Sequence, residues 1–509
     1  MEASTHPDRG TRMRSISLMP HWRLLLSFLL SIASTAAVAQ HKPGEIVIER
    51  GTIHDEKGVP VAYEIGTLYV PENRNKPDSR LIGIGFARIR SPHPTGAPPV
   101  FWLPGGPGLS VLGSFAKNDM GKLRLWLNLA AIGDLVVVEQ RGYTARGEML
   151  LAPRAAWPLD RPASVRASAV EMQAQAKAAV AANPDKDLSG YDIGEFATDV
   201  DDLRRALGYG KISLFGGSFG SQWSLAVMRL HPDAVARAVL SAVEPLDNGY
   251  DMPSSVYAAL QRIAYDADRD PGLKPYLPPG GVMAAVLALR DRFAKGPVRV
   301  ALQDKAGKAR TVVLGAEDLQ LALLSHTDEG ERWPAFILSL YHGHYEAWAQ
   351  EVLDDRAASE TILIGPLADS SLGVSTEREH RLRTDPAVAL LGTWNFEANI
   401  ASAPDWPTRD MGDAIRKSMP SDIPIVFVHG DWDTSTPIDN TLGLLPYFRN
   451  GHAILVHRGG HDGAMYQLRN DDSAKQAVYD FLKTGATKEL PTSATLPLPA
   501  FPVPDFPAP

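Results

Sequence analysis

The sequence predicts an α/β fold with a mostly parallel central sheet, flanked by helices and carrying a mainly helical insertion. Short, continuous apolar runs are typical of parallel strands buried on both faces. Five segments each contain one such run: 98–104, 134–142, 211–217, 423–430 and 452–457. Helical patterns at 193–210 and 221–232 alternate with these runs, as an α/β fold requires. Between 246 and 420 the alternation stops, and Ala- and Leu-rich helical patterns dominate.

Two further segments differ from this rhythm. Residues 59–70 and 80–90 alternate apolar and polar side chains, and a turn rich in Pro, Asn and Asp separates them. This pattern predicts an antiparallel strand pair before the parallel strands. Within the helical insertion, only 298–303 and 310–315 look like strands.

These patterns divide the chain into five parts. The last part carries many prolines, and we expect it to be an extended tail. The parts are a signal peptide (1–39), a first core part (40–245), the helical insertion (246–420), a second core part (421–490) and the proline-rich tail (491–509).

The N-terminus has the pattern of a secretory signal. Arg12, Arg14 and Arg23 precede the apolar run 24–32, and small residues follow up to Ala39. The run is too short for a good membrane span, so we expect none after cleavage. The sequence thus predicts a secreted or periplasmic protein that starts near Gln40, with an uncleaved anchor as the alternative.

Composition excludes several classes of function. The chain has 509 residues and no cysteine, so disulfides, thiolate catalysis and cysteine-ligated metals are ruled out. Its net charge is −8, and it lacks the basic stripe of a nucleic-acid-binding protein. The sequence does not set the oligomeric state.

Ser218 is the candidate nucleophile. It lies in "GGSFG" (216–220), between an apolar strand and a predicted helix. A sharp strand-to-helix turn exposes a serine hydroxyl, and small neighbours relieve its crowding. The N-terminus of the following helix favours negative charge beside it. A serine hydroxyl also needs a base, a group that orients the base, and donors for the developing oxyanion.

Candidate acids follow a later strand. Asp431 and Asp433 come directly after the apolar run 423–428. Strand-end loops are where an α/β sheet presents its functional groups. The alternative to a catalytic acid is a loop aspartate that caps a turn, and Asp431 fits this alternative better.

The candidate base is His461, in a glycine-rich loop beyond the strand 452–457. His452 and His457 are rivals, but His457 lies on the strand itself and is expected to be packed. A histidine beyond the strand end has room to reach a nucleophile.

The oxyanion donors are expected to be backbone N–H groups. One should belong to Phe219, directly after the nucleophile. The other should come from the glycine-rich loop 104–108, where Gly106 is our candidate and the flanking prolines have no N–H to offer. The alternative is that 104–108 is a plain turn.

Five motifs together resemble a known family. In chain order they are "PGGPG" (104–108), "EQRG" (139–142), "GGSFG" (216–220), "GDWDTSTP" (430–437) and "GGH" (459–461). This pattern is similar to the proline iminopeptidase and tripeptidyl aminopeptidase branch of the α/β-hydrolases. The resemblance covers roughly 60–245 and 420–485, and it implies an α/β-hydrolase fold whose helical insertion forms a cap. It also selects Asp433 as the acid, in the order Ser218, Asp433, His461.

The resemblance implies an exported serine hydrolase, an aminopeptidase that releases residues or short peptides from free N-termini through an acyl-enzyme. It implies no metal or organic cofactor. In such enzymes acidic residues hold the substrate's α-ammonium, and Glu244 is a candidate, with a capping or surface role as the alternative. Arg141 is expected to brace its loop through hydrogen bonds.

The sequence departs from the family pattern in three places. Glu139 stands where the family has Asp, and 141–149 replaces a more usual R-G-x-G-x-S. Pro104 favours the tripeptidyl branch over the iminopeptidases.

Two other functions remain open on the sequence. An esterase or other acyl hydrolase would use the same triad, because the cap sets which bond is cut. A non-catalytic binding protein with the same fold would lack a triad member. The expected partner is a small peptide or acyl substrate.

Overall fold

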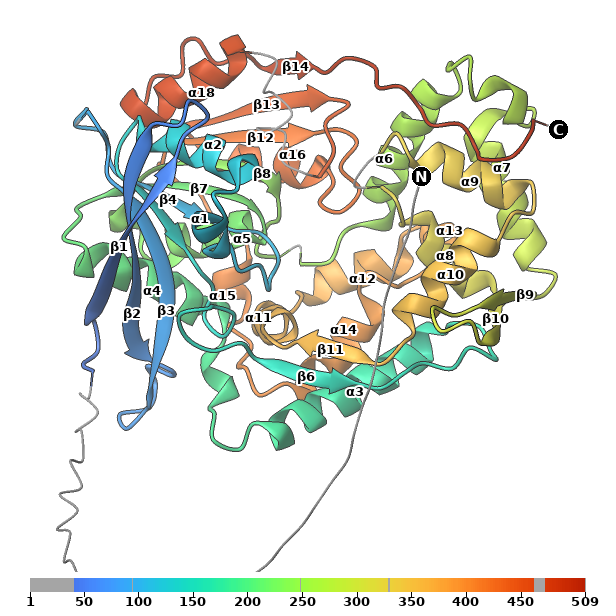
Figure 1. The fold of residues 1–509 in the computed structure, drawn as a ribbon, viewed down its shortest axis with the longest axis horizontal. Coiled ribbons are helices and arrows are strands. Elements are labelled where there is room, and N and C mark those ends of the chain that lie inside the picture. The colour runs from blue at the N-terminus through green and yellow to red at the C-terminus, as the bar shows by residue number, and fades with distance from the viewer. Residues whose placement is uncertain (1–40, 94, 248, 328–329, 462–471, 509) are drawn as a thin grey trace, which may run out of the picture. The chain divides into compact units, whose positions relative to one another are not determined.

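Ten strands form one twisted sheet in the computed structural model, which describes residues 41–508 apart from 94, 248, 328–329 and 462–471 (Figure 1). Their order is β1-β2-β3-β5-β4-β7-β8-β12-β13-β14. The first three strands pair antiparallel, and β3 also pairs antiparallel with β5. The neighbours from β5 to β14 pair parallel. The predicted α/β fold class is therefore confirmed.

The strands lie at or near the predicted segments. The antiparallel strands are β1 (Ile46–His54), β2 (Pro60–Pro71) and β3 (Leu81–Ile89). The parallel strands are β4 (Val100–Leu103), β5 (Leu135–Val138), β7 (Ile212–Ser218), β8 (Val235–Val243), β12 (Ile425–Gly430), β13 (Gly451–His457) and β14 (Ser493–Thr495).

The continuous apolar runs are explained by burial on both faces of the sheet. In β5, Val136 and Val138 belong to one hydrophobic cluster, whereas Leu135 and Val137 belong to another. Helices α4 (Ile193–Ala206) and α5 (Phe219–Leu230) contribute to the first cluster. Helices α2 (Met120–Ala130) and α18 (Asp472–Thr484) contribute to the second, and the short α1 (Gly113–Lys117) lies beside α2.

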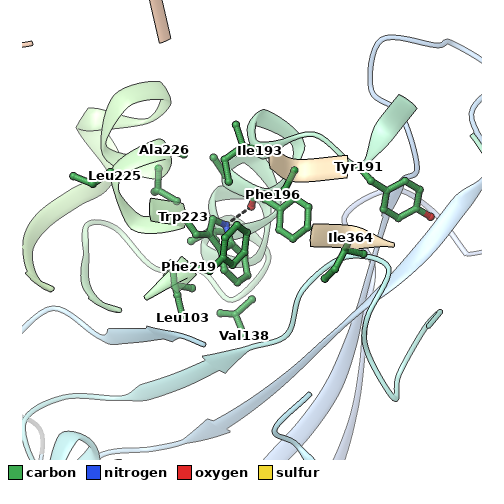
Figure 2. Packing of buried hydrophobic residues seen from close by; sticks show 14 of the residues in the cluster. Leu103, Val138, Tyr191, Ile193, Phe196, Phe219, Trp223, Leu225, Ala226 and Ile364 are labelled. Carbon is green, nitrogen blue, oxygen red and sulfur yellow. Dashed lines mark hydrogen bonds between the residues drawn. The ribbon is translucent and has the colours of Figure 1, made fainter. Parts of the chain in front are cut away.

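Aromatic packing fixes the start of α5 against α4. Figure 2 shows Phe196, Phe219 and Trp223 packed together, and the Trp223 indole N–H donates to the Phe196 carbonyl at 2.8 Å. Phe196 packs edge-on against both other rings, with centroids 5.7 Å away. Burying one such ring stabilises the fold by about 1.5–3 kcal/mol. The turn before α5 is thus held on a rigid support.

The helical insertion leaves the sheet after β8 and returns at β12, its neighbour. We call residues 246–420 the cap. The hairpin β9 (Val298–Gln303) and β10 (Ala309–Leu314) lies at the two strand-like segments that the sequence contains. The α-helices of the cap are α6 (Pro253–Ala267), α7 (Gly281–Phe293), α8 (Ala316–Leu323), α9 (Trp333–Tyr341), α10 (Glu346–Asp355), α11 (Ile364–Leu372), α12 (Thr376–Thr384), α13 (Val388–Leu391), α14 (Glu397–Ser402) and α15 (Asp413–Arg416).

One segment before the cap packs on it, although the sequence interpretation assigned this segment to the core. Strand β6 (Leu151–Arg154) pairs antiparallel with β11 (Ser359–Ile362) of the cap. Helix α3 (Val165–Ala182) runs beside α14 (Figure 1), and Gln173 donates to the Ala401 carbonyl at 2.9 Å. No sequence motif marks this segment as different from the core around it.

The proline-rich tail is extended, but it is packed along the protein. It contributes β14 to the sheet and then runs to the cap (Figure 1). Phe501 is buried in the cap's hydrophobic cluster. The Phe506 carbonyl accepts from the Tyr276 hydroxyl at 2.8 Å, and the Phe506 ring stacks on His344 with centroids 3.9 Å apart.

The remaining elements are short. The predicted signal segment 1–39 lies outside the described residues. Among the residues that are described, no helix has the length and apolar character needed to cross a membrane. The short elements are α16 (Asp439–Leu444) and the 3-10 helices η1 (Leu188–Gly190), η2 (Pro232–Ala234), η3 (Lys274–Tyr276), η4 (Ala403–Asp405) and η5 (Leu445–Tyr447).

Candidate active site

Ser218 lies at a strained turn between β7 and α5. Its backbone has φ 55° and ψ −132°, a region that residues with a side chain rarely adopt. The turn needs glycine on both sides. A Cβ on Gly216 would lie 2.3 Å from the Gly220 carbonyl oxygen, and a Cβ on Gly220 would lie 2.1 Å from that of Leu103. Gly216 and Gly220 are therefore required by space, as the sequence indicated.

His461 connects Ser218 to Asp433. Its Nε2 lies 3.1 Å from the Ser218 Oγ. Its Nδ1 lies 3.1 and 3.2 Å from the two carboxylate oxygens of Asp433. In the neutral imidazole, an Nδ1–H donating to the carboxylate leaves Nε2 free to accept the serine proton. The structure thus brings together the three residues that the sequence singled out.

Asp433 is held in place by several donors. Its carboxylate accepts from the backbone N–H of Ser435 at 3.0 Å and of Thr436 at 2.8 Å, and from the Thr436 hydroxyl at 2.9 Å. Burial alone would raise the pKa of Asp433. Hydrogen bonds from His429 and His461, with their charges, outweigh burial and hold that pKa well below its usual range. Asp433 is consequently ionised at neutral pH.

His429 is a second imidazole on Asp433, and sequence reasoning missed it. It is fully buried at the end of β12, with Nε2 2.6 Å from the Thr436 carbonyl and 3.4 Å from Asp433 Oδ2. Because a carbonyl only accepts, Nε2 carries a proton. Its Nδ1 lies 2.7 Å from the Thr441 hydroxyl. The sequence signal available was a histidine on the strand directly before the acid's loop.

The rival residues pair elsewhere. The Asp431 carboxylate accepts from His457 Nδ1 and from the Arg458 backbone N–H, both at 2.8 Å. His452 Nε2 lies 2.8 Å from the Pro491 carbonyl. Asp431 therefore joins the loops after β12 and β13, while Asp433 faces His461.

The loop 104–108 runs beside the serine. A Cβ on Gly105 would lie 3.3 Å from the Ser218 Cβ, so the loop backbone approaches the serine closely. The N–H of Phe219, at the first position of α5, has no partner one turn earlier in the helix. Among the hydrogen bonds of the described residues, none uses the N–H of Gly106 or of Phe219. Both donors are available to a ligand.

The "EQRG" segment (139–142) holds the residues that directly follow this loop. Glu139 is fully buried, and its carboxylate accepts from the Val111 and Leu112 backbone N–H groups at 2.9 and 3.1 Å and from the Thr144 hydroxyl. Arg141 is also fully buried and donates to the Asp199 carboxylate and to the Glu72 carbonyl. Arg141 thus braces the segment through hydrogen bonds.

Three further carboxyl groups form a cluster around Glu244: the charges of Glu244 and Asp251 interact with that of Asp433, and the charge of Asp369 interacts with that of Glu244. Glu244 follows β8, Asp251 begins the cap, and Asp369 lies on α11; all three are partly buried. Burial raises the pKa of Asp251 and of Asp369, each to about 7. Burial, together with the charges of Asp369, Asp251 and Asp433, raises the pKa of Glu244 well above its usual value. Within the described residues none of the three forms an ion pair with a cation.

Sequence reasoning named Glu244 but missed Asp251 and Asp369. Both belong to the cap, whose sequence carries no motif. A cavity of about 370 Å³ opens beside Asp251, and residues of both the core and the cap line it. Its lining residues are Gly249, Asp251, Leu324, Thr327, Asn395, Thr434 and Ser435. A second cavity, of about 490 Å³, lies near the opposite ends of β8 and β12 and is lined by none of the residues singled out above.

Two family models match the chain. One describes the α/β hydrolase fold and matches 173–275, which includes Ser218 and Glu244. The chain thus has the α/β-hydrolase fold. The other model, described as TAP-like protein, matches 394–494, which includes Asp433 and His461. The two matches therefore lie on either side of most of the cap.

Relatives of this chain include two tripeptidyl aminopeptidases. That of Streptomyces coelicolor is 27% identical over 504 residues, covering 89% of this chain and 87% of the relative. That of Streptomyces lividans is 27% identical and covers 89% of this chain and 88% of the relative. The resemblance to this branch of the family is thus confirmed, and the chain is a hydrolase similar to these peptidases.

Solved structures add only distant similarity. A laboratory-evolved potato epoxide hydrolase is 14% identical, with a TM-score of 0.36 over 82% of this chain and 99% of that one. An esterase from Thermogutta terrifontis is 13% identical, with a TM-score of 0.32 over 83% and 99%. Neither bears on the activity of this hydrolase.

Proposed function

We propose that this hydrolase is an exported serine aminopeptidase that releases residues or short peptides from free N-termini. The observation that carries the proposal is the contact chain from Ser218 through His461 to Asp433, with distances of 3.1 Å on both sides of the imidazole. A hydroxyl, an imidazole and a buried carboxylate in this arrangement form the triad of serine hydrolases.

The reaction starts with attack of the Ser218 oxygen on the substrate carbonyl carbon. His461 Nε2 accepts the serine proton as the new C–O bond forms. The carbonyl oxygen becomes an oxyanion, which the N–H groups of Gly106 and Phe219 stabilise. The C–N bond then breaks, and His461 gives its proton to the leaving amine. Water resolves the acyl-enzyme by the same steps, with His461 taking the proton of water and returning it to Ser218.

Asp433 acts through His461. Its ionised carboxylate fixes the imidazole with Nε2 toward the serine and stabilises the imidazolium that forms. The low pKa of Asp433 supports this role, because the carboxylate stays charged throughout the reaction.

The carboxyl groups of Glu244, Asp251 and Asp369 favour a peptide with a free amine over a neutral ester. Burial disfavours the charged form of each group and raises its pKa, and within the described residues none of them forms an ion pair with a cation partner. An α-ammonium would supply that partner through charge-assisted hydrogen bonds. The two relatives named tripeptidyl aminopeptidase support the same substrate class.

Export is proposed from the N-terminal pattern of arginines, apolar run and small residues. Cell fractionation with N-terminal sequencing of the mature protein tests this part. A mature chain starting near Gln40 outside the cytoplasm is expected, and an intact N-terminus would contradict cleavage.

The activity test compares the mature protein with Ser218→Ala on three substrate types. These are aminoacyl and tripeptidyl chromogenic amides, the same amides with an acetylated N-terminus, and short acyl esters. We expect cleavage of the free-amine amides and a loss of about 10⁴-fold or more in Ser218→Ala. Ser213→Ala is the matched control, because Ser213 is buried on the same strand and its hydroxyl forms no hydrogen bond among the residues that the structure describes.

Two outcomes would overturn the proposal. Activity that survives Ser218→Ala would reject the nucleophile. Preference for esters or for acetylated amides would reject the aminopeptidase and assign an acyl hydrolase with the same triad.

A further inference from the structure

Gln140 is buried directly beneath the loop 104–108 and touches it at both ends. It follows β5 and is fully inaccessible to solvent. Its side-chain NH₂ donates to the Gly105 carbonyl at 2.7 Å and to the Pro104 carbonyl at 3.3 Å. Its side-chain oxygen accepts from the Gly108 N–H at 2.6 Å. One amide group thus bonds the residues on either side of Gly106.

These contacts fix the orientation of the amide. A backbone N–H needs an acceptor and a carbonyl needs a donor, so the two ends of the amide cannot exchange. Gln140 is also enclosed by protein, where an unmet hydrogen bond costs about 1–3 kcal/mol. Gln140 therefore stabilises the observed conformation of the loop over conformations that would break these hydrogen bonds.

The loop conformation matters for Ser218. Gly105, which accepts from Gln140, is the glycine of this loop at which an added Cβ would meet Ser218, at 3.3 Å from its Cβ. Gly106 has φ 111°, a conformation that residues with a side chain rarely adopt. Its N–H forms no hydrogen bond within the described residues, so Gln140 holds the flanks of Gly106 while leaving its donor free.

We propose that Gln140 is a positioning residue, which holds the loop 104–108 so that its backbone donor stabilises the oxyanion formed at Ser218. This inference rests on the proposed serine mechanism, although it does not depend on whether the substrate is a peptide or an ester. Gln140 itself touches no reacting atom. Its contribution belongs to the transition state, in which the oxygen carries charge, and is small in the bound substrate.

The remainder of the loop has its own support. Glu139 holds Val111 and Leu112, just beyond the glycines, through backbone hydrogen bonds. Removing the Gln140 amide therefore leaves the far end of the loop anchored. We expect Gln140 variants to fold and to retain substrate binding.

The first test is Gln140→Met, which keeps the length of the side chain and removes its hydrogen bonds. On whichever chromogenic substrate the wild-type protein turns over, kcat should fall about 10–100-fold while KM changes less than about threefold. Affinity for a peptide aldehyde, whose bound oxygen occupies the oxyanion position, should fall by the same factor as kcat/KM. Gln173→Met is the control, because Gln173 also donates to a backbone carbonyl but lies on α3 against the cap.

The second test is Gln140→Glu, read as a pH profile. When protonated, the introduced carboxyl offers one acceptor and one donor in place of the amide. When ionised, it places negative charge against the carbonyls of Pro104 and Gly105 and disturbs the loop. Activity of this variant relative to wild type should consequently rise as pH falls, a change that a purely structural role would not produce.

Several results would overturn the inference. They are a kcat of Gln140→Met within twofold of wild type, a change confined to KM, aldehyde affinity unchanged while kcat falls, and a flat ratio of Gln140→Glu to wild type across pH. If Gln140→Met does not fold, the pH profile of Gln140→Glu decides. Failure of the serine mechanism would show separately, as activity that survives Ser218→Ala.

Discussion

Asp433 and Asp369 both interact with Glu244, and their own surroundings shift their pKa values in opposite directions. Asp433, in a core loop, has donors from Ser435, Thr436 and His461, and its pKa is lowered. Asp369, on cap helix α11, is desolvated, and its pKa is raised to about 7. Hydrogen bonds to the ionised carboxylate lower the pKa of Asp433, whereas burial raises the pKa of Asp369.

This difference separates two tasks. A carboxylate whose hydrogen bonds are already made within the protein can orient a neighbour but has little left for a ligand. A carboxyl group without such partners gains most when a cation arrives. Asp433, in the core, is thus suited to orienting the imidazole of His461, whereas Asp369, in the cap, is suited to meeting a cation.

The largest expected effect comes from Asp433→Asn. The amide removes the charge that stabilises the imidazolium and favours the wrong tautomer of His461, so kcat should fall about 10³–10⁴-fold with little change in KM. Steady-state kinetics on a free-amine amide measures this. Asp431→Asn is the control, since Asp431 pairs with His457. Equal losses in the two variants would contradict the assignment of the acid.

A smaller effect is expected from Asp369→Asn. If Asp369 binds the α-ammonium, kcat/KM for free-amine peptides should fall about 10–100-fold, the size of one hydrogen bond to a charged group. Turnover of an uncharged ester should remain within about threefold. Comparing the two substrate types in one preparation checks this. An equal loss on both would mean that Asp369 acts on the reaction and would weaken the contrast between core and cap.

The smallest effect concerns stability and its pH dependence. The pKa of Asp369 is raised in the folded protein from an ordinary 3.8 to about 7, so between these values the folded state holds a proton that the unfolded chain has released. This group therefore makes the protein less stable as pH rises through that window, and the loss is complete above about pH 7. Replacing the carboxyl group should therefore remove this loss of stability at high pH.

Asp369→Asn should accordingly be more stable than wild type by about 1–2 kcal/mol at pH 8 and equally stable near pH 4. Urea unfolding at the two pH values measures this. Asp291→Asn, at an exposed position on α7, should show no such difference between the two pH values. A variant that is destabilised at pH 8 would show that Asp369 has a stabilising partner.

Ser218 and Asp433 were predictable because the residues directly beside them in the sequence mark each position. Ser218 is marked by two glycines that the turn requires, and Asp433 by the strand before it. His429 was missed because a buried strand histidine has the same sequence appearance whether it contacts a carboxylate or only packs. The family pattern completed the set where spacing alone left Asp431 open.

The cap residues were not predictable in the same way. Asp369 comes near Glu244 on helix α11, which follows β11, and β11 pairs with β6 from another part of the chain. That pairing joins residues about 200 positions apart, such as Ala152 and Thr361, and no local pattern encodes it. For the same reason the segment 151–182 was assigned to the core, and the docking of Phe501 on the cap was not foreseen.

The position of the cap between two neighbouring strands also has a consequence for the order of folding. Ala238 of β8 lies beside Ile425 of β12, so their pairing must close a very long loop of chain. Closing a flexible loop of that length costs about 5 kcal/mol of chain entropy. A cap that collapses first around its own cluster of buried residues would hold the two ends near each other and remove much of this cost. We therefore expect early cap formation to set the rate at which the central sheet is completed.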